Sequence, residues 1–128
     1  MTNIDSVLDH ERFDAYRLSL DLVEFAETVT RGLPATRKYV ADQLRRAALS
    51  VSLNIAEGAG EFAPVDKRRF YRMARRSATE CSAALDVCMR LQLADPETLK
   101  RARAIAVRIV SCLTALCRTL EGKPRSQP

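Results

Sequence analysis

The sequence is poor in the residues that end helices and in those that build most enzyme sites. Its 128 residues include only four glycines and five prolines, most of them at the edges of periodic segments, which favours an all-α class. His10 is the single histidine and no Glu-x-x-His pair is present, so the ligand set of a di-iron bundle is excluded. No phosphate-cradling glycine loop of the P-loop or dinucleotide type occurs. We therefore expect a protein that has no catalytic residues and is not an enzyme.

Targeting and membrane-spanning segments are also missing from the sequence. Residues 1–5 lack the basic region and the following apolar run of a signal peptide. No window approaches the roughly 20 apolar residues that a membrane span needs. We expect a cytoplasmic protein with no membrane partner.

The cysteines are few and their spacing is not that of a metal site. None forms a C-x-x-C pair, and in a reducing cytoplasm all of them should stay reduced. They fall on apolar helix faces, where cysteine behaves as a small hydrophobic residue. Core packing is the favoured interpretation, a four-thiolate site across two helices is the alternative, and we expect no metal and no cofactor. The four residues are Cys81, Cys88, Cys112 and Cys117.

Charge is present in quantity but is unevenly distributed. Apolar residues make up 47% and charged residues 29%, as in a globular domain with a real core. Residues 1–36 hold three arginines and seven acidic residues, a balance of −4. Residues 37–128 hold 18 basic and nine acidic residues, a balance of +9. The basic part could attract a phosphate polymer, or it could be an ordinary solvated surface.

Hydrophobic periodicity predicts four amphipathic helices with short connections, the pattern of an all-α, antiparallel up-down four-helix bundle. Asp14 is the expected N-cap of the first helix, and Gly58 is the expected C′ stop of the second. Pro64 should open the third helix, and Asp95 with Pro96 should open the fourth. The expected divisions are an N-terminal lead-in at 1–12, one bundle domain at 13–121 and a disordered tail at 122–128.

The second helix is apolar on two sides, which indicates burial on two sides. One stripe should face its own bundle: Val40, Leu44, Ala47, Ala48, Val51 and Ile55. The opposite stripe should face a sister subunit: Leu49, Leu53 and Ala56. Between the stripes, Asn54 and Glu57 are expected to brace the turn into the third helix or a subunit contact.

The third helix carries a group of five arginines within an arc of roughly 120°. We call it the arginine cluster: Arg68, Arg69, Arg72, Arg75 and Arg76. Only Asp66 and Glu80 are close enough in sequence to neutralise it. Guanidinium groups fit phosphate oxygens, so the cluster predicts contact with a nucleic-acid backbone, while the scarcity of aromatics argues against base stacking. The alternatives are pairing with carboxylates of another subunit, such as Glu24 or Glu27, and simple solvation.

The helix-two residues resemble a bacterial family of four-helix-bundle proteins first noticed in intervening sequences of 23S rRNA genes. The relatives include the accessory variability (Avd) proteins of diversity-generating retroelements. The resemblance spans about residues 13–91, with support from Phe13, Tyr16 and Phe70. Its most specific motif is Gln43-Leu44-Arg45-Arg46-Ala47-Ala48, Ser50 and Asn54-Ile55-Ala56-Glu57-Gly58-Ala59-Gly60. Departures from the usual family pattern are Val40-Ala41, Glu61 and Arg76.

The resemblance implies an up-down bundle that assembles into a ring-like homopentamer and has a basic surface for nucleic acid. Within retroelements it implies docking to a reverse transcriptase, and it implies no catalytic activity. The motif residues are expected to be structural: Gln43, Arg45, Arg46, Asn54, Glu57 and Gly58. The sequence thus predicts a non-enzymatic homo-oligomer that contacts RNA or DNA phosphates through the arginine cluster. The alternatives are a scaffold that docks a protein such as a reverse transcriptase, and a small-ligand or metal bundle that uses the cysteines.

Overall fold

The chain folds into four long helices in a computed structural model that describes residues 3–121, with side chains from residue 12 onward. No strand is found in this range. The helices are α1 (Asn3–Arg31), α2 (Lys38–Ala59), α3 (Pro64–Arg90) and α4 (Pro96–Glu121), with a single-turn 3₁₀ helix η1 (Ala35–Arg37) between the first two. The predicted all-α class and four-helix architecture are confirmed.

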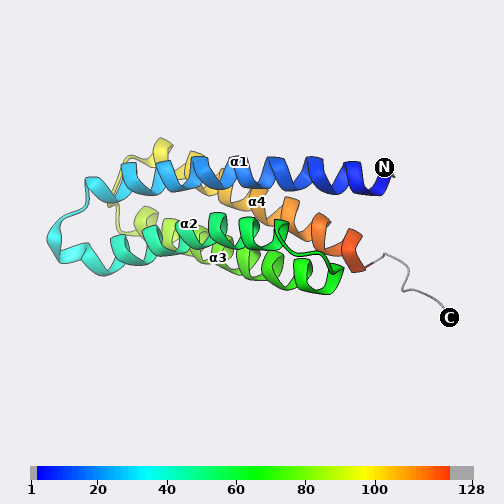
Figure 1. The fold of residues 1–128 in the computed structure, drawn as a ribbon. Coiled ribbons are helices and arrows are strands. Elements are labelled where there is room, and N and C mark those ends of the chain that lie inside the picture. The colour runs from blue at the N-terminus through cyan, green and yellow to red at the C-terminus, as the bar shows by residue number, and fades with distance from the viewer. Residues whose placement is uncertain (1–2, 122–128) are drawn as a thin grey trace.

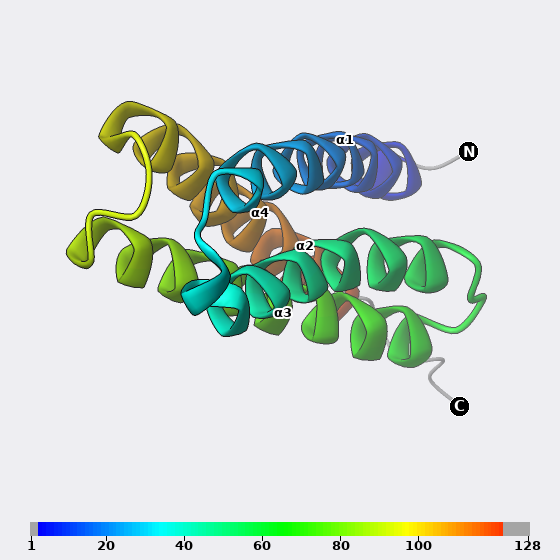
Figure 2. The same cartoon turned by 90° about the vertical axis from the view of Figure 1, so that its left-hand side faces the viewer.

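The helices alternate in direction along the chain and form an antiparallel bundle (Figures 1 and 2). Helix α1 packs against α2 and α4, and α3 packs against the same two, so α1 and α3 lie diagonally across the bundle. The start of α1, the α2–α3 connection and the end of α4 lie at one end of the molecule (Figure 1). Among the described helices, none has the combination of length and apolar character that a bilayer crossing requires.

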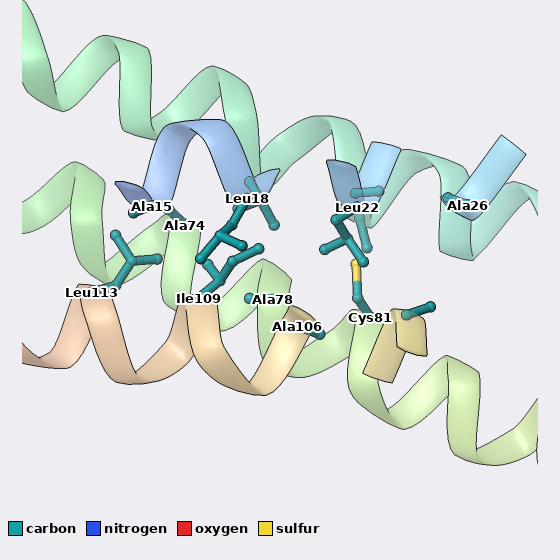
Figure 3. Packing of buried hydrophobic residues seen from close by; sticks show 14 of the residues in the cluster. Ala15, Leu18, Leu22, Ala26, Ala74, Ala78, Cys81, Ala106, Ile109 and Leu113 are labelled. Atoms are coloured by element: carbon teal, nitrogen blue, oxygen red, sulfur yellow. The ribbon is translucent and has the colours of Figure 1, made fainter. Parts of the chain in front are cut away.

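The core is built mainly from leucine, alanine and cysteine side chains. Figure 3 shows Leu18 and Leu22 of α1 pointing into the space that Ile109 of α4 and Cys81 of α3 also occupy. Each fully buried leucine contributes about 1.5–3 kcal/mol relative to an exposed one. All six bundle-facing residues predicted for the second helix are buried, so that stripe is confirmed. In α3, Tyr71 belongs to the buried core, while the neighbouring Phe70 is only partly buried.

Two predicted helix boundaries are wrong. Helix α1 begins at Asn3, so Asp14 lies inside the helix and is not its N-cap. Helix α2 continues through Gly58 to Ala59, so Gly58 is not a C′ stop. The proposed division at residue 12 remains a prediction, and the tail at 122–128 lies outside the described residues.

Gly58 is instead a contact residue between α2 and α3. A Cβ atom added at Gly58 would lie 2.6 Å from Cε1 and 2.9 Å from Cδ1 of the buried Tyr71 ring. No real Cβ atom tolerates such a distance, so the absence of a side chain is what lets the ring lie against the helix backbone. The glycine therefore serves close packing rather than a left-handed turn.

The other connections follow the expected chemistry. Asp95 Oδ2 accepts hydrogen bonds from the N–H and the hydroxyl of Thr98, both at 3.0 Å, which confirms Asp95 as the N-cap of α4. Pro64 and Pro96 are the first residues of α3 and α4, as predicted. At the end of α3, Gln92 has a φ of 55°, a conformation that glycine usually adopts.

Candidate nucleic-acid interface

Positive charge is concentrated on the hairpin formed by α3 and α4. Residues 64–121 contain 12 basic and six acidic residues. The described part of α1 from residue 12 contains three basic and four acidic residues. The bundle therefore has a basic side at α3–α4 and a mildly acidic helix diagonally opposite α3.

The arginine cluster divides into two sets according to which way its members face. Arg68 and Arg75 are half-buried on the side of α3 that meets α4. Arg69 and Arg76 are exposed on the outer face, and Arg72 is exposed between the two sets. The cluster is thus one continuous surface with an inner edge that contacts α4 and an outer edge that faces solvent.

The inner edge has a partner that sequence spacing did not predict. Glu121, the last residue of α4, has its Oε1 atom 2.9 Å from Arg72 Nη2 and 3.9 Å from Arg68 Nε. Arg75 Nη1 donates to Thr114 Oγ1 at 3.4 Å. The expectation that only Asp66 and Glu80 neutralise the cluster is therefore wrong, because a carboxylate from α4 lies against it.

The outer edge makes fewer contacts. Arg69 lies over the ring of the adjacent Phe70, with its guanidinium carbon 5.0 Å from the ring centroid, a cation–π geometry. Arg76 makes no hydrogen bond or ion pair with another described residue. These two guanidiniums can reach an anion in solvent without a change in the fold, and that of Arg72 can do so when it releases Glu121.

Charges of the cluster also reach the core beneath it. Burial raises the pKa of the Cys117 thiol, and the nearby Arg75, Arg72 and Arg68 charges oppose that rise. Burial raises the pKa of Cys81 to about 12, with a smaller contribution from Glu80. Thiols with raised pKa values are poor nucleophiles and poor metal ligands, so these cysteines are packing residues.

The cysteines do not gather into one site. All four are free thiols, and only Cys112 is partly exposed. Among the residues whose side chains are described, no three His, Cys, Asp or Glu groups lie together as a metal ion would require. The cysteines along α3 and α4 are therefore spaced for packing between helices.

Two motif residues of α2, Arg45 and Ser50, make hydrogen bonds to neighbouring helices. Arg45 donates to Asp42 Oδ1 at 2.9 Å and to Thr30 Oγ1 of α1 at 3.3 Å. Asn54 Nδ2 donates to the Ser50 hydroxyl at 3.0 Å, and that hydroxyl also accepts from Ser77 of α3 at 2.9 Å. These bonds link α2 to both of its neighbours.

The turn into α3 is braced by a residue other than the two expected ones. Lys67 Nζ donates to the carbonyl oxygens of Gly58 and Ala59, both at 3.3 Å, and so satisfies two carbonyls at the end of α2. Glu57 is exposed, as are Gln43 and Arg46. Asn54 bonds back to Ser50, and Lys67 makes the hydrogen bonds to this turn. The alternative, that Asn54 and Glu57 support a subunit contact, stays a prediction.

A separate apolar face runs along the outside of α1 and α2. Leu49 and Leu53 are 51% and 56% exposed, and Ala56 is also exposed. Ala56 lines a groove of about 360 Å³ with Phe13 and Tyr16 of α1. Leu20, one turn beyond Tyr16, is 48% exposed. We define the apolar face by these six residues: Phe13, Tyr16, Leu20, Leu49, Leu53 and Ala56.

Sequence reasoning missed the partners that come from other helices. Glu121 and Lys67 were not identified, because each acts across a helix–helix contact whose register was unknown. In an antiparallel helical hairpin, residues equally far from the connecting turn lie side by side. Counting in both directions from the turn at Asp95 would therefore have placed the end of α4 beside Arg68 and Arg72. The α1 half of the apolar face was not predicted, because Phe13 and Tyr16 were considered only as support for the family resemblance.

Comparison with known proteins adds the following. A family described as 23S rRNA-intervening sequence protein matches residues 11–115. Among solved structures, the chain is similar to a protein with unknown function from the S23 ribosomal protein family of Bacteroides thetaiotaomicron. The TM-score is 0.71 and the identity 15%, with 88% of this chain and 98% of that chain covered, so the likeness concerns the fold alone. No curated protein matches the chain.

Proposed function

The chain belongs to the family of 23S rRNA-intervening sequence proteins, and we propose that it is a non-enzymatic, self-assembling bundle that binds nucleic acid through its α3–α4 side. The observation that carries the proposal is the exposed part of the arginine cluster, which consists of its two outer residues and Arg72. Arg69, Arg72 and Arg76 are exposed in a row on one face of a rigid helix. Arginine at such a surface binds phosphate oxygens in a forked geometry.

The spacing of this row suits a phosphate backbone. Positions 69 to 76 span about 10 Å along the helix axis at 1.5 Å per residue. One nucleic-acid strand carries a negative charge about every 3.4 Å of helix axis, so the row can meet more than one phosphate. The nearby aromatic residues are not available for stacking, since Tyr71 is buried and Phe70 is half-buried beneath Arg69. The proposed contact is therefore with the backbone and not with the bases.

Fluorescence anisotropy with labelled structured RNA and duplex DNA tests this proposal. We expect binding to both at low salt, with affinity that falls steeply toward physiological salt because each neutralised phosphate releases counterions. Absence of binding to either probe at low salt would contradict the proposed function.

A second candidate function is supported by the apolar face on α1 and α2. Large exposed apolar surfaces on small proteins mark sites of association. We propose that this face contacts a second copy of the chain, and the five-copy ring implied by the resemblance is the expected assembly. The relation to accessory variability proteins is part of the same proposal. In that case the assembled scaffold would dock a reverse transcriptase through its basic face. A reverse transcriptase gene beside this one would favour the docking function.

Light scattering on variants tests the assembly. Leu53→Glu places a charge in the middle of the apolar face, and we expect the measured mass to fall toward that of a monomer. Val107→Glu is the matched control, because Val107 is 44% exposed on α4, away from this face, and its variant should keep the wild-type mass. A wild-type mass of one chain, or an unchanged mass in Leu53→Glu, would contradict the proposed interface.

A further inference from the structure

On the inner edge of the arginine cluster, the Glu121 carboxylate lies where a phosphate ligand could bind. We propose that Arg68 and Arg72 form a seat for one backbone phosphate, and that Glu121 occupies this seat in the free chain and leaves it on binding. The inference rests on the proposed function and adds to it a defined site and an internal competitor. We call the two arginines the phosphate seat.

The geometry shows that the phosphate seat already holds an anion. Both Arg68 Nε and Arg72 Nη2 approach the same oxygen, Glu121 Oε1, at 3.9 and 2.9 Å. The Arg68 side chain is only 23% exposed, so packing holds its guanidinium toward α4. A phosphodiester carries one negative charge on its free oxygens, as a carboxylate does, and can take the same two donors.

The position of Glu121 in the helix shows why it is a weak occupant. It is the last residue of α4, where the helix dipole disfavours a negative charge. The attraction that holds Glu121 must therefore come from the arginines. The Glu121 side chain is 48% exposed, so solvent and salt weaken its ion pairs with them. Once Glu121 is counted, the two arginines of the seat retain a charge of about +1 for an incoming phosphate.

Arg75 lies farther along the contact between α3 and α4. Its Nη1 atom donates to Thr114 of α4, two helical turns before Glu121. Seven residues of helix span about 10 Å, so Arg75 is not a third donor to the anion that Arg68 and Arg72 hold. Its charge adds to the positive potential beside the phosphate seat.

Anisotropy measurements on a charge-neutral variant of Glu121 test the inference. Glu121→Gln keeps the size of the side chain and removes the competitor, so the variant should bind a duplex DNA 20-mer about three- to tenfold more tightly than wild type does. The slope of log affinity against log salt should stay close to that of wild type, because both proteins neutralise the same number of phosphates once Glu121 has left the seat.

Two controls separate competition at the seat from a general change in charge. The first control is Asp86→Asn. It removes one negative charge from the same hairpin, but at the ion pair between Asp86 and Arg103, whose atoms are 2.7 Å apart, and not at the seat. It should change the affinity for DNA by less than about twofold. In an Arg68→Gln, Arg72→Gln background, Glu121→Gln should give no gain, because the two guanidiniums for which Glu121 and the phosphate compete are gone.

The outcomes distinguish the two proposals. If wild type binds DNA but Glu121→Gln gives no gain, or Asp86→Asn gives an equal one, the seat is wrong and the proposed function stands. A gain that persists without Arg68 and Arg72 also overturns the seat. If no variant with an intact arginine cluster binds at low salt, the proposed function itself fails.

Discussion

Gly58 illustrates how one residue can be required for a reason that its sequence context does not reveal. Its position near the end of α2 predicts a helix stop, but its φ is not positive and the helix continues past it. The requirement comes from Tyr71, which is distant in sequence and lies against the glycine backbone. Close approach between helices, rather than chain reversal, explains the glycine.

Substitution of this glycine should reverse the usual effect of adding a methyl group to a helix. Gly→Ala inside an unobstructed helix stabilises by about 1 kcal/mol. We expect Gly58→Ala to destabilise by about 1–3 kcal/mol in urea unfolding, because its Cβ overlaps the Tyr71 ring.

Gly60→Ala is the matched control for this substitution. The nearest atom to its Cβ would be the Glu57 carbonyl oxygen at 3.6 Å, an ordinary contact, and its φ is −82°. It should be neutral or more stable by up to about 1 kcal/mol. Equal stability of Gly58→Ala and wild type would refute the packing role.

The arginines also differ individually although they share one helix. Arg68 and Arg75 contact α4, whereas Arg69 and Arg76 face solvent. Helical spacing predicted the cluster but not this division, since the direction of α4 from α3 depends on tertiary packing. Removal of an outer arginine should therefore weaken ligand binding without a change in stability.

At the level of elements, the α3–α4 connection contains Gln92 in a left-handed conformation that glycine usually adopts. The Leu93 N–H donates to the Cys88 carbonyl at 2.9 Å and the Gln92 N–H to the Met89 carbonyl at 3.1 Å. This pattern caps the last turn of α3 around the positive φ of Gln92. Leu93 then packs against the core, which fixes the angle at which α4 begins.

Replacement of this residue by glycine should stabilise the fold. A left-handed conformation costs a residue with a Cβ roughly 1–2 kcal/mol, and the extra chain entropy of glycine offsets part of that. We expect Gln92→Gly to raise the free energy of unfolding by about 0.5–1 kcal/mol and Gln92→Ala to give no gain, measured by thermal and urea unfolding. A less stable Gln92→Gly variant would show that the glutamine side chain itself supports the turn.

The same elements show how far the sequence could be read. Periodicity predicted the four helices and the bundle-facing stripe of α2, because amphipathic spacing reflects burial directly. Proline and aspartate at Pro64 and Asp95 marked two helix starts correctly. The start of α1 was not predicted. Ile4, Val7 and Leu8 stand at helical spacing, but the acidic residues among them were interpreted as a lead-in. Interhelical contacts such as Lys67 with Gly58 depend on register, which no single segment encodes.

At the level of the whole molecule, the bundle separates two kinds of surface. The apolar face lies along the outside of α1 and α2, and the arginine cluster lies on α3 toward α4. A chain that associates through the first surface would leave the second exposed on every copy. An assembly that presents the same weak contact with the phosphate backbone on several copies binds nucleic acid more tightly than one copy does, without any new kind of contact. The proposed self-assembly would thus strengthen the proposed binding of nucleic acid.

The most direct test of this account is the salt dependence of binding to duplex DNA, measured by anisotropy for wild type and for the variant Arg69→Gln, Arg72→Gln, Arg76→Gln. If this face of α3 binds the phosphate backbone, the slope of log affinity against log salt becomes shallower by about two to three, close to one for each phosphate that the variant no longer neutralises. A variant with the wild-type slope and affinity would contradict the claim that this face of α3 binds the phosphate backbone.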